Sequence, residues 1–318
     1  MSTLPSEDGI REMIRQELFA EQEARREAAC CAAGGTEAHP PAVWAEHRRV
    51  LCEWTLALCR AAGMTRETFC LAASLLDRYV TECCAAMGDK GYPSEGTLQL
   101  LAMTCLSLAM KYEEVAPLHS ADLLRLAIDP CTGALLYTAA DLARMEWLVL
   151  QMLSWRVRMP TAASFLTLLL PACGAASAAS SSLADVPCRD GSAHAHVSAG
   201  ELLVHWATRL LDMCVLLAHQ LPHQASTIAM ACLLIAERLS SANAAATQRI
   251  LQFWRELLPN VGQQQQQLQQ VQQCARAVEA MWCAAHGDCT HLFSYQLQYV
   301  TAAVSQAAAP APAPAMST

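Results

Sequence analysis

Basic residues are scarce in this chain of 318 residues: 21 Lys and Arg stand against 29 Asp and Glu, which gives a net charge of −8. A protein that binds nucleic acid directly needs a clustered basic face. We therefore expect no nucleic acid as a direct partner. Glycine and runs of β-branched residues are also scarce, whereas alanine and leucine are abundant, and this composition favours an all-α fold.

The sequence also lacks the usual marks of a membrane, secreted or catalytic protein. Its longest uncharged stretch, residues 159–184, is interrupted by Pro171 and Gly174, so we expect no membrane span. The first residues are charged and hold no apolar signal-peptide region, which favours an intracellular, reducing location in the nucleus or cytoplasm. No glycine-rich phosphate loop, G-x-S-x-G elbow or H-E-x-x-H helix occurs, so we expect neither enzymatic activity nor a cofactor.

Cysteine is abundant, with 16 residues, but no two are spaced as C-x-x-C. Buried cysteine in a reducing compartment behaves as a small apolar residue. One group, Cys283, His286, Cys289 and His291, combines soft ligands at short spacing, but no second group matches it. We predict no metal site, and we interpret most cysteines as core residues, among them Cys52, Cys59, Cys70, Cys105, Cys214 and Cys232.

Helical patterns indicate two consecutive five-helix bundles, each with one central helix that is apolar all round. The first central helix, from Thr97, has no charge for fourteen residues and then ends in Lys-Tyr-Glu-Glu. Such a helix must be enclosed by others, because no face of it favours water. The predicted divisions are a polar, partly disordered leader over residues 1–41, a first bundle over 42–159, a second bundle over 160–285 with an Ala/Ser-rich insert at 172–198, and a tail over 286–318 that is Ala/Pro-rich from 306.

Helix starts are marked by residues that cap the first turn. Thr65 and Ser94 precede the second and third helical patterns of the first bundle. Thr138, followed by Asp141 three residues later, is typical of a capping box.

Four charged residues stand in apolar helical surroundings, each on a different predicted helix of the first bundle: Arg48, Asp77, Lys111 and Glu146. An unpaired buried ion is costly, so each must pair internally or reach a partner. Spacing alone favours internal salt bridges or charges at helix ends.

Longer motifs point to a family. HRRVLCEWT (47–55), LLDRYV (75–80), LQLLAMTCLSLAMKYEE (98–114) and RMEWLVLQMLSWRVRMPTAASFL (144–166) resemble, in this order and spacing, the cyclin box. The segments LLVHWATRLLDMCVLLAHQL and ASTIAMACLLIAERL are similar, more loosely, to the C-terminal cyclin fold. The resemblance covers about residues 42–285.

The resemblance implies a regulatory and activating subunit of a cyclin-dependent Ser/Thr kinase in cell-cycle control, which does no chemistry itself. Arg48 and Asp77 match the family's internal ion pair, which ties the first helix of the box to the second. Lys111 and Glu146 match the pair that contacts the kinase on either side of its regulatory helix. The positions that pack against that helix in the family are matched by Tyr112, Leu150 and Val157, and Leu100 matches an apolar position of the same box.

The resemblance also implies a groove that recruits substrates or inhibitors through Arg-x-Leu motifs. The matching residues are Val50, Leu51, Trp54 and Gln99, although Trp54 could instead be a core residue. The chain departs from the pattern where His47 replaces a methionine, and where Ala57 replaces the acidic residue that holds the motif's arginine. The latter change predicts a weaker preference for basic motifs.

Two questions stay open at this level. Cyclin boxes also occur in transcription-associated proteins of the factor-IIB kind and in cyclins of transcriptional kinases. A factor-IIB-like protein predicts basic helix faces and a zinc ribbon, which the sequence lacks. The subtype is also open, because Pro160-Thr161 resembles A- and B-type cyclins whereas Trp155 resembles D- and E-type boxes.

Overall fold

The computed structural model describes residues 6–32, 40–128, 131–173, 199–218, 221–240, 244–258 and 261–286. These residues form helices joined by short connections, with one isolated antiparallel bridge between Ile128 and Leu135. The predicted all-α class is confirmed. The elements are α1 (Glu7–Ala32), α2 (Trp44–Ala61), α3 (Arg66–Met87), the 3-10 turn η1 (Gly88–Gly91), α4 (Glu95–Glu113), α5 (Ser120–Leu124), α6 (Ala139–Met152), α7 (Ala162–Ala172), α8 (Ala199–Leu216), α9 (Ala225–Ser240), α10 (Ala244–Leu257) and α11 (Val261–His286).

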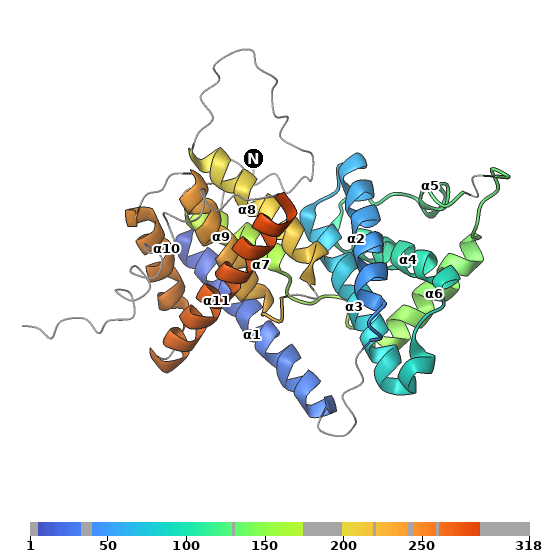
Figure 1. Ribbon diagram of the computed structural model, residues 1–318, viewed down its shortest axis with the longest axis horizontal. Coiled ribbons are helices and arrows are strands. Elements are labelled where there is room, and N and C mark those ends of the chain that lie inside the picture. Colours follow the sequence, from blue (N-terminus) through green and yellow to red (C-terminus); the bar gives the residue numbers. More distant parts are fainter. Residues whose placement is uncertain are drawn as a thin grey trace, which may run out of the picture.

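Figure 1 shows two groups of helices side by side, α2–α6 in one and α7–α11 in the other. The central helix of the first group is α4, in which every residue from Leu100 to Met110 is buried. It is enclosed by α2, α3 and α6. In the second group α9 has the same place, buried almost continuously from Ser226 to Arg238 among α7, α8, α10 and α11. Two five-helix bundles with enclosed central helices are therefore present, as the sequence predicts.

Local capping explains where several of these helices begin. Thr138 and Asp141 form the predicted capping box at the start of α6. The Oγ1 atom of Thr65 accepts from the backbone N–H of Thr68 at the start of α3. Ser94 has the N-cap position of α4, but its hydroxyl caps no backbone N–H and contacts Thr97 Oγ1 instead.

Helix α1 lies within the predicted polar leader and packs against α7 and α10 of the second bundle. Its inner side buries Ile10, Ile14 and Leu18 at helical spacing. On the same helix the buried carboxylate of Glu21 accepts from the backbone N–H of Ser226 at 3.0 Å and from its hydroxyl at 2.6 Å. Glu21 thus supplies from a distant helix the oxygen that caps the start of α9.

The two bundles are joined by charged contacts that converge on the second half of α8. Asp212, with 4% of its side chain exposed, pairs with Arg66 at 2.6 Å and with Arg60 at 3.1 Å. Arg48 donates from Nη1 to the carbonyls of Val215 and Leu216 at 2.7 and 3.0 Å. Because these three arginines lie on α2 and at the start of α3, α8 is fastened to both helices.

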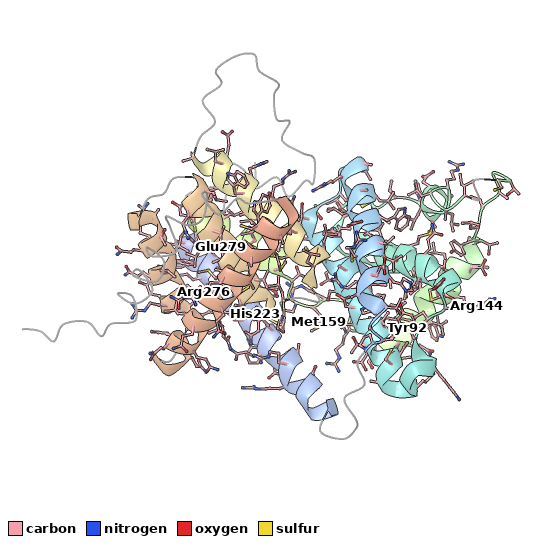
Figure 2. The ribbon with its side chains drawn as sticks, viewed as in Figure 1. Tyr92, Arg144, Met159, His223, Arg276 and Glu279 are labelled. Carbon is pink, nitrogen blue, oxygen red and sulfur yellow. The ribbon has the colours of Figure 1, made fainter. Side chains whose placement is uncertain are left out.

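The second bundle has a buried ion pair of its own. Nη1 of Arg238 on α9 lies 2.8 Å from Oε1 of Glu279 on α11, and both side chains are almost fully buried. Glu279, labelled in Figure 2, lies in the group formed by α7–α11. Burial raises the pKa of the Glu279 carboxyl, and the Arg238 charge opposes that rise.

Candidate functional site

The four charged residues of the first bundle form two ion pairs in the structure. Arg48 on α2 makes a bidentate pair with Asp77 on α3, with Nε–Oδ1 and Nη2–Oδ2 distances of 2.6 and 2.9 Å. The Arg48 side chain is almost fully buried and also holds the end of α8. This pair ties α2 to α3, the role that the resemblance implies, and it reaches the second bundle as well.

The second pair lies at the edge of the bundle. Lys111, in the last turn of α4, has its Nζ 2.5 Å from Oε1 of Glu146 on α6. The same oxygen accepts from the hydroxyl of Ser107 at 2.6 Å. Lys111 is 48% exposed, whereas Glu146 is 17% exposed. The carboxylate is therefore oriented by two donors, and the ammonium group faces solvent from the negative end of the α4 dipole.

Apolar side chains follow the two members of this edge pair along the chain. Tyr112 is half exposed, and Leu150 and Val157 are half buried against the core. Two tryptophans join them: Trp147 follows Glu146 in α6, and Trp155 lies just beyond the end of the same helix. We call this surface the Lys111–Glu146 face; its residues are Lys111, Tyr112, Glu146, Trp147, Leu150, Trp155 and Val157.

The two tryptophans are the part of this face that sequence reasoning did not place in a site. Trp147 and Trp155 are 52% and 59% exposed, and their rings meet edge to face with centroids 5.7 Å apart. Large aromatic side chains left in solvent are typical of interaction surfaces. Sequence alone could not distinguish these tryptophans from core residues such as Trp254, which is fully buried.

The residues predicted for a docking groove lie on α2 and at the start of α4. Val50 is half exposed, while Leu51 and Trp54 are half buried and pack against the core. Gln99 accepts through Oε1 from the hydroxyl of Tyr137 at 3.3 Å. Tyr137 also donates to the Gly96 carbonyl at 3.2 Å, so it fixes the connection that leads into α6 beside the start of α4.

The two departures from the family pattern have visible consequences. Nδ1 of His47 lies 2.8 Å from the hydroxyl of Tyr92, and the two rings stack. Tyr92 follows η1 and is labelled in Figure 2. Ala57 is exposed and provides no carboxylate, and Glu53, one turn earlier, is paired with Arg49 at 2.8 Å.

Other sequence signals add no site among the residues that the structure describes. No group of three or more His, Cys, Asp or Glu residues there could hold a metal ion, and Cys289 and His291 lie outside those residues. The helices of that part of the chain are too short or too polar to cross a membrane. Several buried thiols have strongly perturbed acidities: burial raises the pKa of Cys52 to about 12 and that of Cys70 well above its ordinary value.

Comparison with known proteins finds similarity to cyclins over the first part of the chain. Residues 14–158 match the family model described as the cyclin N-terminal domain. Cyclin-D4-1 from Arabidopsis thaliana is 37% identical over 125 residues, which is 39% of this chain and 37% of that protein. Other curated cyclins match over 20% to 35% of their own length. The chain thus spans well under two thirds of these relatives.

Solved structures support the same fold. The X-ray structure of a viral cyclin from herpesvirus saimiri superposes with a TM-score of 0.50 at 18% identity, covering 74% of this chain and 86% of that one. A chain in the structure of the CAK complex from Chaetomium thermophilum bound to ATP-gamma-S also gives 0.50, at 14% identity, covering 95% of this chain and 84% of that one. Residues 14–158 therefore carry a cyclin N-terminal domain, and the chain is a cyclin-box protein.

Proposed function

We propose that this chain is the regulatory and activating subunit of a cyclin-dependent Ser/Thr kinase in cell-cycle control, acting in the nucleus or cytoplasm. The observation that carries the proposal is the Lys111–Glu146 pair at the edge of the first bundle, flanked by exposed aromatic side chains. The motif positions that the family uses to hold the kinase's regulatory helix coincide with this face. No site for chemistry is needed, because the kinase supplies it.

The chemistry of the face suits a helix that inserts against it. A lysine and a glutamate can make charge-assisted hydrogen bonds to the polar backbone groups at a helix end. The exposed area of Tyr112, Trp147 and Trp155 supplies the aromatic anchors that dominate binding energy at interfaces. Lys111 is held on α4, whose enclosure by three helices makes it a rigid support.

Binding of this kind would act on the kinase by position. A regulatory helix held inward keeps its glutamate within reach of the lysine on strand β3, and that ion pair is required for phosphoryl transfer. In the free chain Lys111 and Glu146 bond to each other. Kinase binding would exchange this bond for contacts to the inserted helix.

The test is binding of the full chain to a panel of purified cyclin-dependent kinases, measured by biolayer interferometry. A Lys111→Ala, Glu146→Ala double variant should lose at least about 2 kcal/mol of binding, or about 30-fold in Kd, to the kinase that binds the wild type. The matched control is Asp122→Ala with Arg125→Ala, which removes an exposed ion pair of 3.0 Å between α5 and its C-cap residue. Equal affinity of wild type and the Lys111–Glu146 variant for every kinase would sink the proposal.

We further propose that the surface of Val50, Leu51, Trp54 and Gln99 recruits substrates or inhibitors through an apolar motif residue. The half-exposed Val50 beside Leu51 and Trp54 supports this role. With Ala57 in place of an acid, the motif's arginine finds no carboxylate at that position. Recognition would therefore depend on the leucine of an Arg-x-Leu segment more than on its arginine.

A further inference from the structure

The turn that follows α6 has an unusual backbone. Ser154 and Trp155 have φ values of 50° and 61°, and they are the non-glycine residues with positive φ in the described part of the chain. The amide of Trp155 donates to Leu150 O at 2.8 Å and that of Ser154 donates to Gln151 O at 3.0 Å. These two bonds form a Schellman motif, in which glycine is the usual residue at the position of Ser154. The backbone strain must be offset by the surroundings.

The same turn fixes the most exposed aromatic side chain of the Lys111–Glu146 face. Trp155 projects to solvent and meets Trp147 edge to face. A backbone change at Ser154 or Trp155 would therefore move this ring relative to Glu146. The position of Trp155 depends on whatever holds the segment that comes after it.

That segment is held by α1. Arg156 pairs with Glu27, and Arg158 pairs with Glu17, both on α1. The two pairs differ in burial: Arg156 and Glu27 are both more than half exposed, whereas in the other pair Glu17 is 9% exposed and Arg158 is 47% exposed. Exposed ion pairs contribute little, but a buried carboxylate that loses its cation is costly. The Glu17–Arg158 pair is therefore the contact that resists movement.

Arg158 also faces the end of α4. The groups that act on its charge, besides Glu17, are Tyr112 and Glu113. The guanidinium is thus paired with α1 and is close enough to the end of α4 to be affected by its charges. A change in how α1 docks would therefore act near the Lys111–Glu146 face through Arg158.

We propose that α1 positions Trp155 for kinase binding, with the buried Glu17 carboxylate holding Arg158 and, through it, the strained turn at residues 154–155. Glu17 and Arg158 are positioning residues that act through Trp155. The inference rests on the proposed function for its effect on affinity, but the placement of the ring can be tested in the free chain.

The first experiment is ¹⁹F NMR of the full chain labelled with 5-fluorotryptophan, with the Trp155 signal assigned by Trp155→Phe. Glu17→Gln keeps the shape of the side chain and removes its charge, and it should shift or broaden the Trp155 signal. Glu27→Gln makes the same change on the same helix at the exposed pair and should leave that signal in place. Arg158→Gln tests the Glu17–Arg158 pair from its other side, should Glu17→Gln fail to fold.

The second experiment is a double-mutant cycle on kinase affinity. Glu17→Gln should weaken binding about tenfold in the wild-type background, the factor that corresponds to one hydrogen bond of ordinary strength. In a Trp155→Ala background it should change Kd by less than about twofold, because the residue through which it acts is gone. An unchanged Trp155 signal in Glu17→Gln, or equal losses of affinity in both backgrounds, would overturn the inference. If the wild type binds no kinase, the proposed function fails and the NMR result still decides the positioning.

Discussion

Replacing Asp212 with alanine tests how firmly the two bundles are joined. Asp212 is almost fully buried on α8 and serves two arginines of the first bundle, Arg66 and Arg60. Its removal leaves both guanidinium groups without this carboxylate. Breaking a buried ion pair by deleting one partner costs about 3–5 kcal/mol. Because a third of the Arg60 side chain is exposed and can turn to water, we expect a value near the lower limit, about 3 kcal/mol.

The assay is equilibrium unfolding in urea, followed by tryptophan fluorescence and by far-UV circular dichroism. Asp212→Ala should lower the free energy of unfolding by about 3 kcal/mol, or split the transition in two if the bundles separate first. Adding Arg66→Met should recover part of the loss, because it removes the more buried of the two uncompensated charges. Asp122→Ala at the exposed pair should change stability by less than about 0.5 kcal/mol. A loss below about 1 kcal/mol for Asp212→Ala would refute the idea that this carboxylate joins the bundles.

Three further predictions concern pH, cysteine reactivity and docking. Burial raises the pKa of Glu21, so the contribution of this carboxyl to stability is greatest at low pH and is lost as the pH rises through the raised pKa. In urea unfolding the wild type should therefore lose stability relative to Glu21→Gln between acidic and neutral pH, and a constant difference would contradict this. Buried thiols with raised pKa values, such as Cys52 and Cys70, should resist iodoacetamide in the native chain, while the exposed Cys131 is alkylated. Mass spectrometry of the peptides measures this labelling, and rapid labelling of Cys70 would be the contrary result. In fluorescence polarisation, Ala57→Glu should raise the affinity for an Arg-x-Leu peptide about tenfold and leave the affinity for an Ala-x-Leu peptide unchanged. A wild-type chain that already binds the arginine peptide about tenfold more tightly than the alanine peptide would contradict our account of the groove.

The parts of the fold that sequence predicts are those with local causes. The apolar run of α4 requires enclosure wherever it is placed, because all of its faces avoid water. The capping box of Thr138 and Asp141 joins residues three apart, so its spacing can be read directly. The motifs around Lys111 and Glu146 place Lys111 in the last turn of one helix and Glu146 within another, and the structure brings the two side chains into contact.

The parts that sequence does not predict depend on contacts between distant segments. Asp212 meets Arg60 and Arg66 across about half the chain, and no spacing rule connects such positions. The docking of α1 is similar: the sequence predicts a polar leader there, and only the fold shows that Ile10, Ile14 and Leu18 are buried and that Glu21 caps α9. Trp155 has a different cause, since its exposure depends on a strained turn that its sequence neighbours would not indicate.

The measurement that tests the central claim most directly is the rate of peptide phosphorylation by the kinase that the chain binds, with and without the chain at saturating concentration. Our account predicts that the wild type raises this rate, and that the Lys111→Ala, Glu146→Ala variant does so only at a concentration about 30-fold higher. A wild-type chain that binds the kinase without raising its rate, or a double variant that activates at the same concentration as wild type, would contradict it.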